Sequence, residues 1–216
     1  LKHVNLISLW DIREDSQGNG WVVMEYVPGG SLRDVIEASR SGMEFEKVQD
    51  WFRGIASGVR HLHNHGIVHR DLKPGNVFWD EDERVVKIGD YGLSKLMSAG
   101  RLSGQTESVG TFHYMAPEIG RGIYGKEIDL YALGIILYEM LTGQVPFDGE
   151  SSQEIMMKHL TAEPELSCLQ GGVRTLIEKS LSKDPDRRYE NIDAMLVDFD
   201  KSVSYTHLTL PTSLIV

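Results

Sequence analysis

The sequence has a single cysteine, lacks any long hydrophobic run and carries fewer basic than acidic residues. Cys168 has no second cysteine with which to form a disulfide within the chain, which fits the reducing environment of the cytoplasm. No apolar segment approaches the roughly 20 residues that a membrane-spanning helix needs. The first residues show no basic and apolar pattern of a signal peptide. We therefore expect a cytoplasmic domain that depends on its hydrophobic core.

Basic charge is also in short supply. The formal net charge is −10, from 22 lysine and arginine residues against 32 aspartate and glutamate residues. Nonspecific nucleic-acid binding depends on clustered cations that displace counterions from phosphates, so we expect no nucleic-acid partner. The length of 216 residues and the hydrophobic fraction of 41% are typical of one soluble globular domain.

Two hairpins and several helices are predicted from local patterns. Residues 6–12 and 21–27 flank a turn-forming segment, and residues 77–79 and 85–88 flank an acidic turn. Ser31 is the expected N-cap of a short helix that ends at 37. Apolar spacing predicts further helices over 46–63, 129–141, 152–160, 173–181 and 191–199. Few strands and many helices predict an α+β fold, with the almost wholly apolar segment 129–141 buried on all sides.

Three short motifs carry the chemistry. His-Arg-Asp-Leu-Lys-Pro-Gly-Asn at 69–76 lies between a predicted helix and a predicted strand, Asp-Tyr-Gly at 90–92 follows the next strand, and Ala-Pro-Glu comes at 116–118. Phosphoryl transfer needs a carboxylate that orients and deprotonates the attacking hydroxyl, oxygen ligands for Mg²⁺, and a cation over the transferring group. Asp71 can serve as that carboxylate, and Lys73 as the cation. The metal ligands would be Asn76 and Asp90, and the ordered set is far more specific than any one motif.

These motifs resemble the eukaryotic-type (Hanks-type) serine/threonine protein kinase family over residues 1 to about 200. The resemblance implies that Asp71 is the catalytic base and that Lys73 contacts the γ-phosphate of ATP. It also implies that Asn76 and Asp90 bind Mg²⁺. The implied fold is a mostly helical kinase C-lobe with a few N-lobe strands.

The branch of the family follows from Lys73 and from Thr111, which in the serine/threonine branch contacts the catalytic aspartate and lysine. The resemblance therefore implies transfer of the ATP γ-phosphate to Ser or Thr hydroxyls of protein substrates. The alternative is a pseudokinase, a binding or scaffolding module that keeps the fold without transferring phosphate. The intact set of Asp71, Asn76 and Asp90 argues against that alternative. Resemblance to bacterial members also implies a longer protein with a membrane anchor and a sensor domain beyond this chain.

Other residues resemble the family's adenine site. Met24 resembles the gatekeeper, and the segment from Glu25 to Val27 resembles the hinge whose backbone pairs with adenine. Phe78 would press on the adenine ring from below. Tyr91 stands where most members have Phe, and we expect its hydroxyl to reach a partner or water.

Structural roles are implied for three charged residues. Asp129 would bind the backbone of the catalytic loop at 69–76. Glu118 and Arg188 would form a buried ion pair, and because a buried charge that loses its partner is costly, this pair should matter for folding.

Regulation by phosphorylation is implied by Arg70, which resembles the arginine that pairs with a phosphorylated activation loop. The candidate phosphosites are Ser103, Thr106 and Ser108.

The resemblance divides the chain into three parts. Residues 1–27 would be a remnant of the N-lobe with the hinge, and residues 28–202 the C-lobe. Residues 203–216 resemble one reading frame of a sequencing adapter, so we expect a non-native tail there. The glycine-rich loop and the strand lysine of the family would precede Leu1, so we expect negligible kinase activity from the 216-residue chain by itself.

Overall fold

The computed structural model describes residues 1–91 and 109–208. Strands β1 (Leu9–Glu14) and β2 (Gly20–Met24) form one antiparallel hairpin, and β3 (Val77–Asp80) and β4 (Val85–Ile88) form another. Both predicted hairpins and the α+β fold are therefore confirmed. The helices are α1 (Leu32–Ala38), α2 (Phe45–Asn64), α4 (Val109–Phe112), α5 (Glu127–Thr142), α6 (Ser152–Thr161), α7 (Gly171–Ser180) and α8 (Ile192–Leu208), with 3-10 turns η1 (Pro74–Asn76), η2 (Pro117–Arg121) and η3 (Pro185–Arg187).

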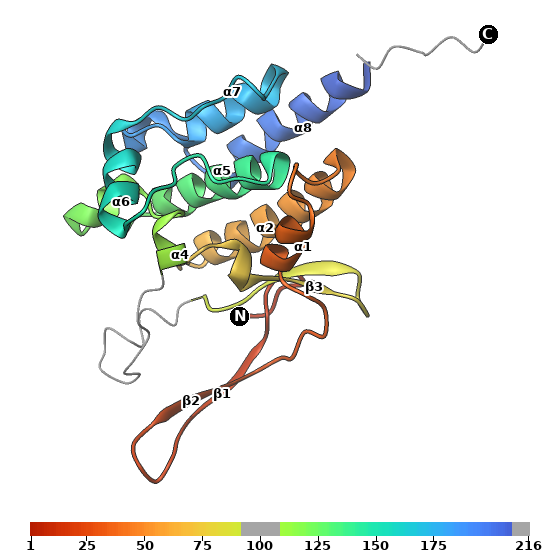
Figure 1. Cartoon of the computed structure of the whole chain (residues 1–216). Helices are drawn as coiled ribbons and strands as arrows, with labels where there is room; N and C mark the ends of the chain where they lie inside the picture. The colour runs from red at the N-terminus through yellow and green to blue at the C-terminus, as the bar shows by residue number, and fades with distance from the viewer. Residues whose placement is uncertain (92–108, 209–216) are drawn as a thin grey trace.

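Helix α5 forms the centre of the hydrophobic core. Every residue from Ile128 to Met140 is buried, which confirms the prediction that this apolar helix is covered on all sides. Helix α2 turns one apolar face toward it, and Phe52, Ile55 and Val59 of that face are fully buried. Helix α7 packs against α5, and α8 packs against both α7 and α2 (Figure 1).

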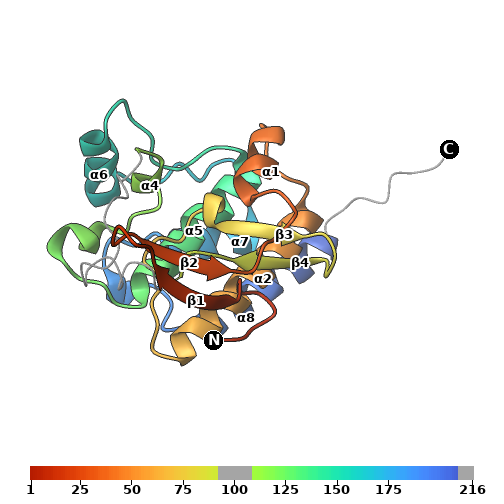
Figure 2. The same cartoon turned by 90° about the horizontal axis from the view of Figure 1, so that it is seen from below.

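The two hairpins lie on the same side of the helical body, as the view from below shows (Figure 2). The β1–β2 hairpin projects away from the helices (Figure 1). The predicted strand over 6–12 is wrong in its bounds, because its first part pairs elsewhere. Leu6 forms a parallel bridge with Ile88, and the Ile7 N–H donates to the Ile88 carbonyl at 2.9 Å. The chain just before β1 is thus joined to β4.

Local chemistry accounts for the connection from α1 to α2. Ser31 caps α1 with a reciprocal capping box to Asp34, as predicted. Gly42 has a φ of +97°, and a Cβ there would lie 2.1 Å from the Leu141 carbonyl oxygen. Only glycine tolerates both conditions, so this close approach fixes the α1–α2 loop against the end of α5.

Helix α8 continues past the predicted end at 199 to Leu208. Val203 is buried with 7% of its surface exposed and belongs to the main hydrophobic cluster. The expected boundary between 202 and 203 therefore falls inside a helix, while the non-native origin of the tail stays a prediction. Within the described residues no helix is long and apolar enough to cross a membrane.

Candidate active site

The predicted catalytic loop at 69–76 connects α2 to β3, and the buried carboxylate of Asp129 binds its backbone. Asp129 lies in the first turn of α5 with 1% of its surface exposed. It accepts hydrogen bonds from the backbone N–H of His69 at 2.8 Å and of Arg70 at 3.1 Å. Arg70 has a φ of +73°, a left-handed conformation that a non-glycine residue keeps only where its surroundings enforce it. The predicted role of Asp129 is confirmed, and it explains how the loop stays in this conformation.

A third donor to Asp129 was missed in the sequence. The Nε2 atom of His63, near the end of α2, lies 2.8 Å from the Asp129 carboxylate, and the side chain of His63 is 8% exposed. The two residues are 66 positions apart, so no local pattern could connect them. With this bond, α2, α5 and the catalytic loop meet at one buried carboxylate.

The predicted reactive groups converge on the carboxylate of Asp71. The Lys73 Nζ atom lies 3.0 Å and 2.8 Å from its two oxygens, and the same Nζ donates to the Thr111 hydroxyl at 2.9 Å. The Asn76 side-chain amide donates to the Asp71 carbonyl at 2.8 Å and to the carboxylate at 3.1 Å. The side chains of Asp71 and Lys73 stay 31% and 24% exposed, so the cluster is open to a substrate. A carboxylate, a cation, a hydroxyl and an amide thus meet at one accessible point.

Asp90 follows β4 and interacts electrostatically with Asp71 and Lys73 of this cluster. Burial raises the pKa of the Asp90 carboxyl; His69 and Lys73 lower it, and the charge of Asp71 raises it further. The Gly89 N–H donates to the Asn76 carbonyl at 2.8 Å, which joins the end of β4 to the catalytic loop. Asp90 itself has a φ of +57°, a strained conformation of the kind found at functional sites. A half-buried carboxylate next to a second carboxylate is a favourable place for a cation.

The site fits a hard metal ion that also binds a ligand's phosphates. The Asn76 amide nitrogen bonds to Asp71, and the side-chain carbonyl oxygen of Asn76 and the carboxylate of Asp90 are both hard oxygen ligands. Among the described residues, no group of three or more His, Cys, Asp or Glu side chains could hold a metal ion. Magnesium commonly binds through one or two protein oxygens together with water and phosphates, so two ligands suffice.

Tyr91, next to Asp90, joins the end of β4 to the chain before β1. Its hydroxyl donates to the Ile7 carbonyl at 2.6 Å, and the side chain is buried. The expectation that this hydroxyl finds a partner is therefore confirmed. On the other side of the strand end, His69 Nε2 lies 3.0 Å from the Gly89 carbonyl oxygen.

The residues predicted to face adenine lie at the end of β2, just after it, and on β3. Met24 ends β2, and Val27 is buried, with 9% of its surface exposed. The Glu25 N–H donates to the Ser8 carbonyl at 2.9 Å, and the Glu25 carboxylate accepts from the Ser8 N–H at 2.9 Å. Phe78 lies against the backbone next to Asp90, since a Cβ on Gly89 would meet its ring at 3.3 Å. Their contacts with a nucleotide stay a prediction.

Glu118 and Arg188 form the predicted buried ion pair. The Arg188 guanidinium makes two bonds to the Glu118 carboxylate, at 2.6 Å and 2.8 Å, and the two side chains are 0% and 5% exposed. The guanidinium also donates to the Ser182 carbonyl at 2.8 Å and lies 4.7 Å from the centre of the Tyr131 ring. The pair joins η2 to α5 and to the segment before α8.

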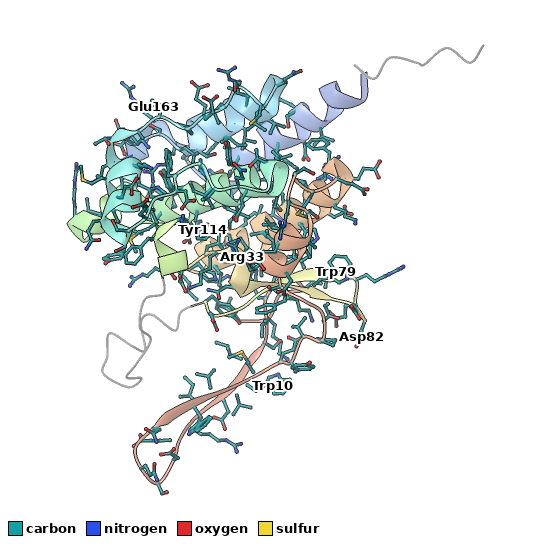
Figure 3. The ribbon with its side chains drawn as sticks, in the orientation of Figure 1. Trp10, Arg33, Trp79, Asp82, Tyr114 and Glu163 are labelled. Atoms are coloured by element: carbon teal, nitrogen blue, oxygen red, sulfur yellow. The ribbon has the colours of Figure 1, made fainter. Side chains whose placement is uncertain are left out.

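A second polar cluster, also missed in the sequence, holds the chain just after Thr111. The Tyr114 hydroxyl donates to the Glu139 carboxylate at 2.7 Å, and Arg33 of α1 donates to the same carboxylate at 2.7 Å and to the Tyr114 hydroxyl. Figure 3 shows Arg33 and Tyr114 next to each other between α1 and α4. This cluster borders a hollow of about 610 Å³. Burial and the Glu139 charge raise the pKa of the Tyr114 hydroxyl, so it stays protonated and donates.

The proposed regulatory residues are only partly described. The guanidinium of Arg70 lies 5.3 Å from the centre of the Tyr124 ring, a cation–π distance. The candidate phosphosites Ser103, Thr106 and Ser108 lie outside the described residues.

Comparison with known proteins agrees with this geometry. Residues 1–199 match the family described as "Protein kinase domain". Serine/threonine-protein kinase PrkC of Bacillus subtilis is 36% identical over 204 residues, which cover 92% of this chain and 31% of that protein. A protein of Lactococcus lactis named "Probable serine/threonine-protein kinase PknB" is 35% identical over 94% of this chain and 33% of its own length. The chain thus spans about a third of the length of these curated relatives. This chain belongs to the protein kinase domain family.

Proposed function

We propose that this chain is the catalytic region of a serine/threonine protein kinase, which transfers the γ-phosphate of ATP to Ser or Thr hydroxyls of proteins. One observation carries the proposal: Lys73 bridges the Asp71 carboxylate and the Thr111 hydroxyl, while the Asn76 amide binds the same carboxylate. The two relatives named above are called serine/threonine kinases, which supports the choice of substrate hydroxyl. The single cysteine supports a cytoplasmic location for the domain.

In this mechanism the Asp71 carboxylate orients the substrate hydroxyl and accepts its proton. The bond between the γ-phosphorus and the β-bridging oxygen breaks while a new bond forms to the Ser or Thr oxygen, and ADP leaves. The Lys73 ammonium stabilises the charge on the transferring phosphoryl group. The Thr111 hydroxyl gives Lys73 a second partner besides Asp71, so that the cation keeps its position without a bound nucleotide.

Asn76 and Asp90 would hold Mg²⁺ through oxygen atoms, and the metal would neutralise charge on the phosphates. The donor set supports this assignment, because both residues offer hard oxygen ligands next to Asp71. The raised pKa of Asp90 has burial as its main cause, and a bound cation would stabilise the charged form. We expect the hinge backbone from Glu25 to Val27, with Met24 and Phe78, to hold the adenine.

The test uses protein expressed from the complete reading frame, with radiolabelled ATP and a generic protein substrate such as myelin basic protein. We expect Asp71→Asn to lower kcat by about 10²–10⁴-fold, the range for loss of a general base. Asp50→Asn is the matched control, because this exposed residue of α2 undergoes the same chemical change outside the motif. ATP binding, measured by calorimetry, should stay within about twofold in both variants, since Asp71 acts mainly in the transition state.

Three results would contradict the proposal. Equal activity of the Asp71 and Asp50 variants would show that Asp71 is not the catalytic base. Phosphotyrosine as the only product would exclude the serine/threonine assignment. Nucleotide binding by the unmodified protein without any transfer would support the pseudokinase alternative.

A further inference from the structure

A buried lysine outside the reactive cluster has more partners than its charge needs. Lys87 of β4 has a side chain that is 4% exposed, and three carboxylates surround its ammonium group. Asp80 and Glu83 each lie 2.9 Å away, and Glu25 is the third partner. Burial lowers the pKa of Lys87, but its bonds to Glu25, Glu83 and Asp80 outweigh this effect and raise it, so the lysine stays charged.

The three carboxylates differ in where they come from. Asp80 and Glu83 belong to the same β3–β4 hairpin as Lys87, and they already compensate the charge of the lysine locally. Glu25 comes from the predicted hinge, 62 positions earlier in the chain. The bond between Lys87 and Glu25 therefore joins the hinge directly to β4.

Glu25 is held from two directions at once. Its second carboxylate oxygen accepts from the Ser8 N–H at 2.9 Å, and its own N–H donates to the Ser8 carbonyl at 2.9 Å. The chain next to Ser8 is itself bonded to β4, because the Ile7 N–H donates to the Ile88 carbonyl at 2.9 Å. The hinge residue, the segment before β1 and β4 thus form one connected network.

This network ends close to the proposed metal ligand. β4 leads from Lys87 through Ile88 and Gly89 directly to Asp90. A contact that sets the hinge relative to β4 also sets the distance between the adenine-binding backbone and the carboxylate that would hold the metal on the phosphates. The binding of the adenine and the binding of the phosphates would both depend on that distance.

We propose that Lys87 is a positioning residue for nucleotide binding, which acts through the Glu25 carboxylate to hold the hinge backbone at a set place relative to Asp90. The proposal rests on the proposed kinase function for its nucleotide. It assigns a task to the side chain of Glu25, whereas backbone pairing with adenine needs only the main chain.

The experiment compares Glu25→Ala with Glu83→Ala in protein expressed from the complete reading frame. Both variants remove one carboxylate partner of Lys87, but only Glu25→Ala breaks the link between the hinge and β4. The side chain of Glu83 is 58% exposed. We expect Glu25→Ala to raise the KM for ATP about tenfold with kcat within about twofold, the pattern of lost uniform binding. Glu83→Ala should change both constants by less than about twofold. Glu25→Gln has one oxygen where Glu25 uses two, so it can accept from Ser8 or from Lys87 but not from both, and we expect a rise in KM smaller than that of Glu25→Ala.

A second measurement is independent of activity. Hydrogen exchange in the 216-residue chain should be faster across residues 24–28 in Glu25→Ala than in Glu83→Ala, because the Glu25 N–H loses its fixed position against Ser8. If the unmodified protein transfers no phosphate, the proposed function fails and exchange alone decides this inference. Equal KM values and equal exchange rates in Glu25→Ala and Glu83→Ala would overturn the inference. A fall in kcat as large as the rise in KM, together with faster exchange throughout the chain, would also overturn it, because it would indicate general destabilisation. If Glu25→Ala does not fold, Glu25→Gln against Glu83→Gln tests the same contact with a smaller expected rise in KM, because Gln keeps only one of the two bonds of Glu25.

Discussion

The Glu118–Arg188 ion pair permits a quantitative test of how the core is held next to the active site. Both side chains are almost completely buried, so water cannot solvate either charge after its partner is removed. Breaking such a pair by removing one member costs about 3–5 kcal/mol of the free energy of unfolding. Arg188 also donates to the carbonyls of Ser182 and Glu127, at 2.8 Å and 3.1 Å, which would lose their partner as well. We therefore expect Arg188→Met near the upper end of that range and Glu118→Leu near the lower end.

The double variant separates the charge effect from lost packing. With both charges removed, neither is left unpaired in the core, so Glu118→Leu with Arg188→Met should cost less than the sum of the single changes by about 2 kcal/mol or more. Urea unfolding of the 216-residue chain, followed by tryptophan fluorescence, measures all four free energies. The exposed pair Arg53–Asp200, with side chains 44% and 57% exposed, is the control, and its coupling should stay below about 1 kcal/mol. Additive losses for Glu118 and Arg188, within about 0.5 kcal/mol, would refute the reasoning.

Three further predictions concern stability. Tyr91→Phe removes the bond to the Ile7 carbonyl and should lower the free energy of unfolding by about 1 kcal/mol, with kinase activity retained. Burial lowers the pKa of His159 to about 3, so the unfolded chain binds a proton that the folded chain does not as the pH falls below 6.5. His159 should therefore cost about 2 kcal/mol of stability between pH 7 and pH 5, and His159→Gln should flatten that part of the urea-unfolding profile. Gly42→Ala should cost at least about 1–2 kcal/mol by thermal unfolding, whereas Gly75→Ala, which meets nothing within 4 Å, should cost less than about 0.5 kcal/mol.

Each of these three stability predictions can be contradicted by a specific result. A loss above about 3 kcal/mol for Tyr91→Phe would mean that the ring, rather than the hydroxyl bond, has been disturbed. A pH profile that is unchanged by His159→Gln would show that His159 titrates normally. Equal melting temperatures for the Gly42 and Gly75 variants would show that the α1–α2 loop can move away from α5.

The sequence predicted the elements well where the signal is local. Ser31 caps α1 as expected, and the apolar helix at 129–141 is buried all round. The predicted ends of the elements were wrong where contacts between distant segments determine them. The run at 6–12 splits because Leu6 and Ile7 pair with β4, and α8 continues past 199 because Val203 finds a buried place in the core. The short helix α4 had no periodic signal over its few residues and was not predicted.

The site followed the same division. Asp71, Lys73 and Asn76 are close in sequence, and their motif predicted that they act together. Thr111 and Asp90 were also predicted, from motif order and family resemblance, but their place beside Lys73 depends on the fold.

The sequence by itself predicted which residues would carry the chemistry, most of the hairpins and helices, and the burial of α5, because turn chemistry, apolar spacing and motif order are properties of short segments. Tertiary structure alone decided the supporting contacts: His63 with Asp129, Lys87 with Glu25, and Arg33 with Glu139, whose partners lie 66, 62 and 106 positions apart. Such pairs leave no periodic trace, since the distance along the chain does not limit which side chains the fold brings together.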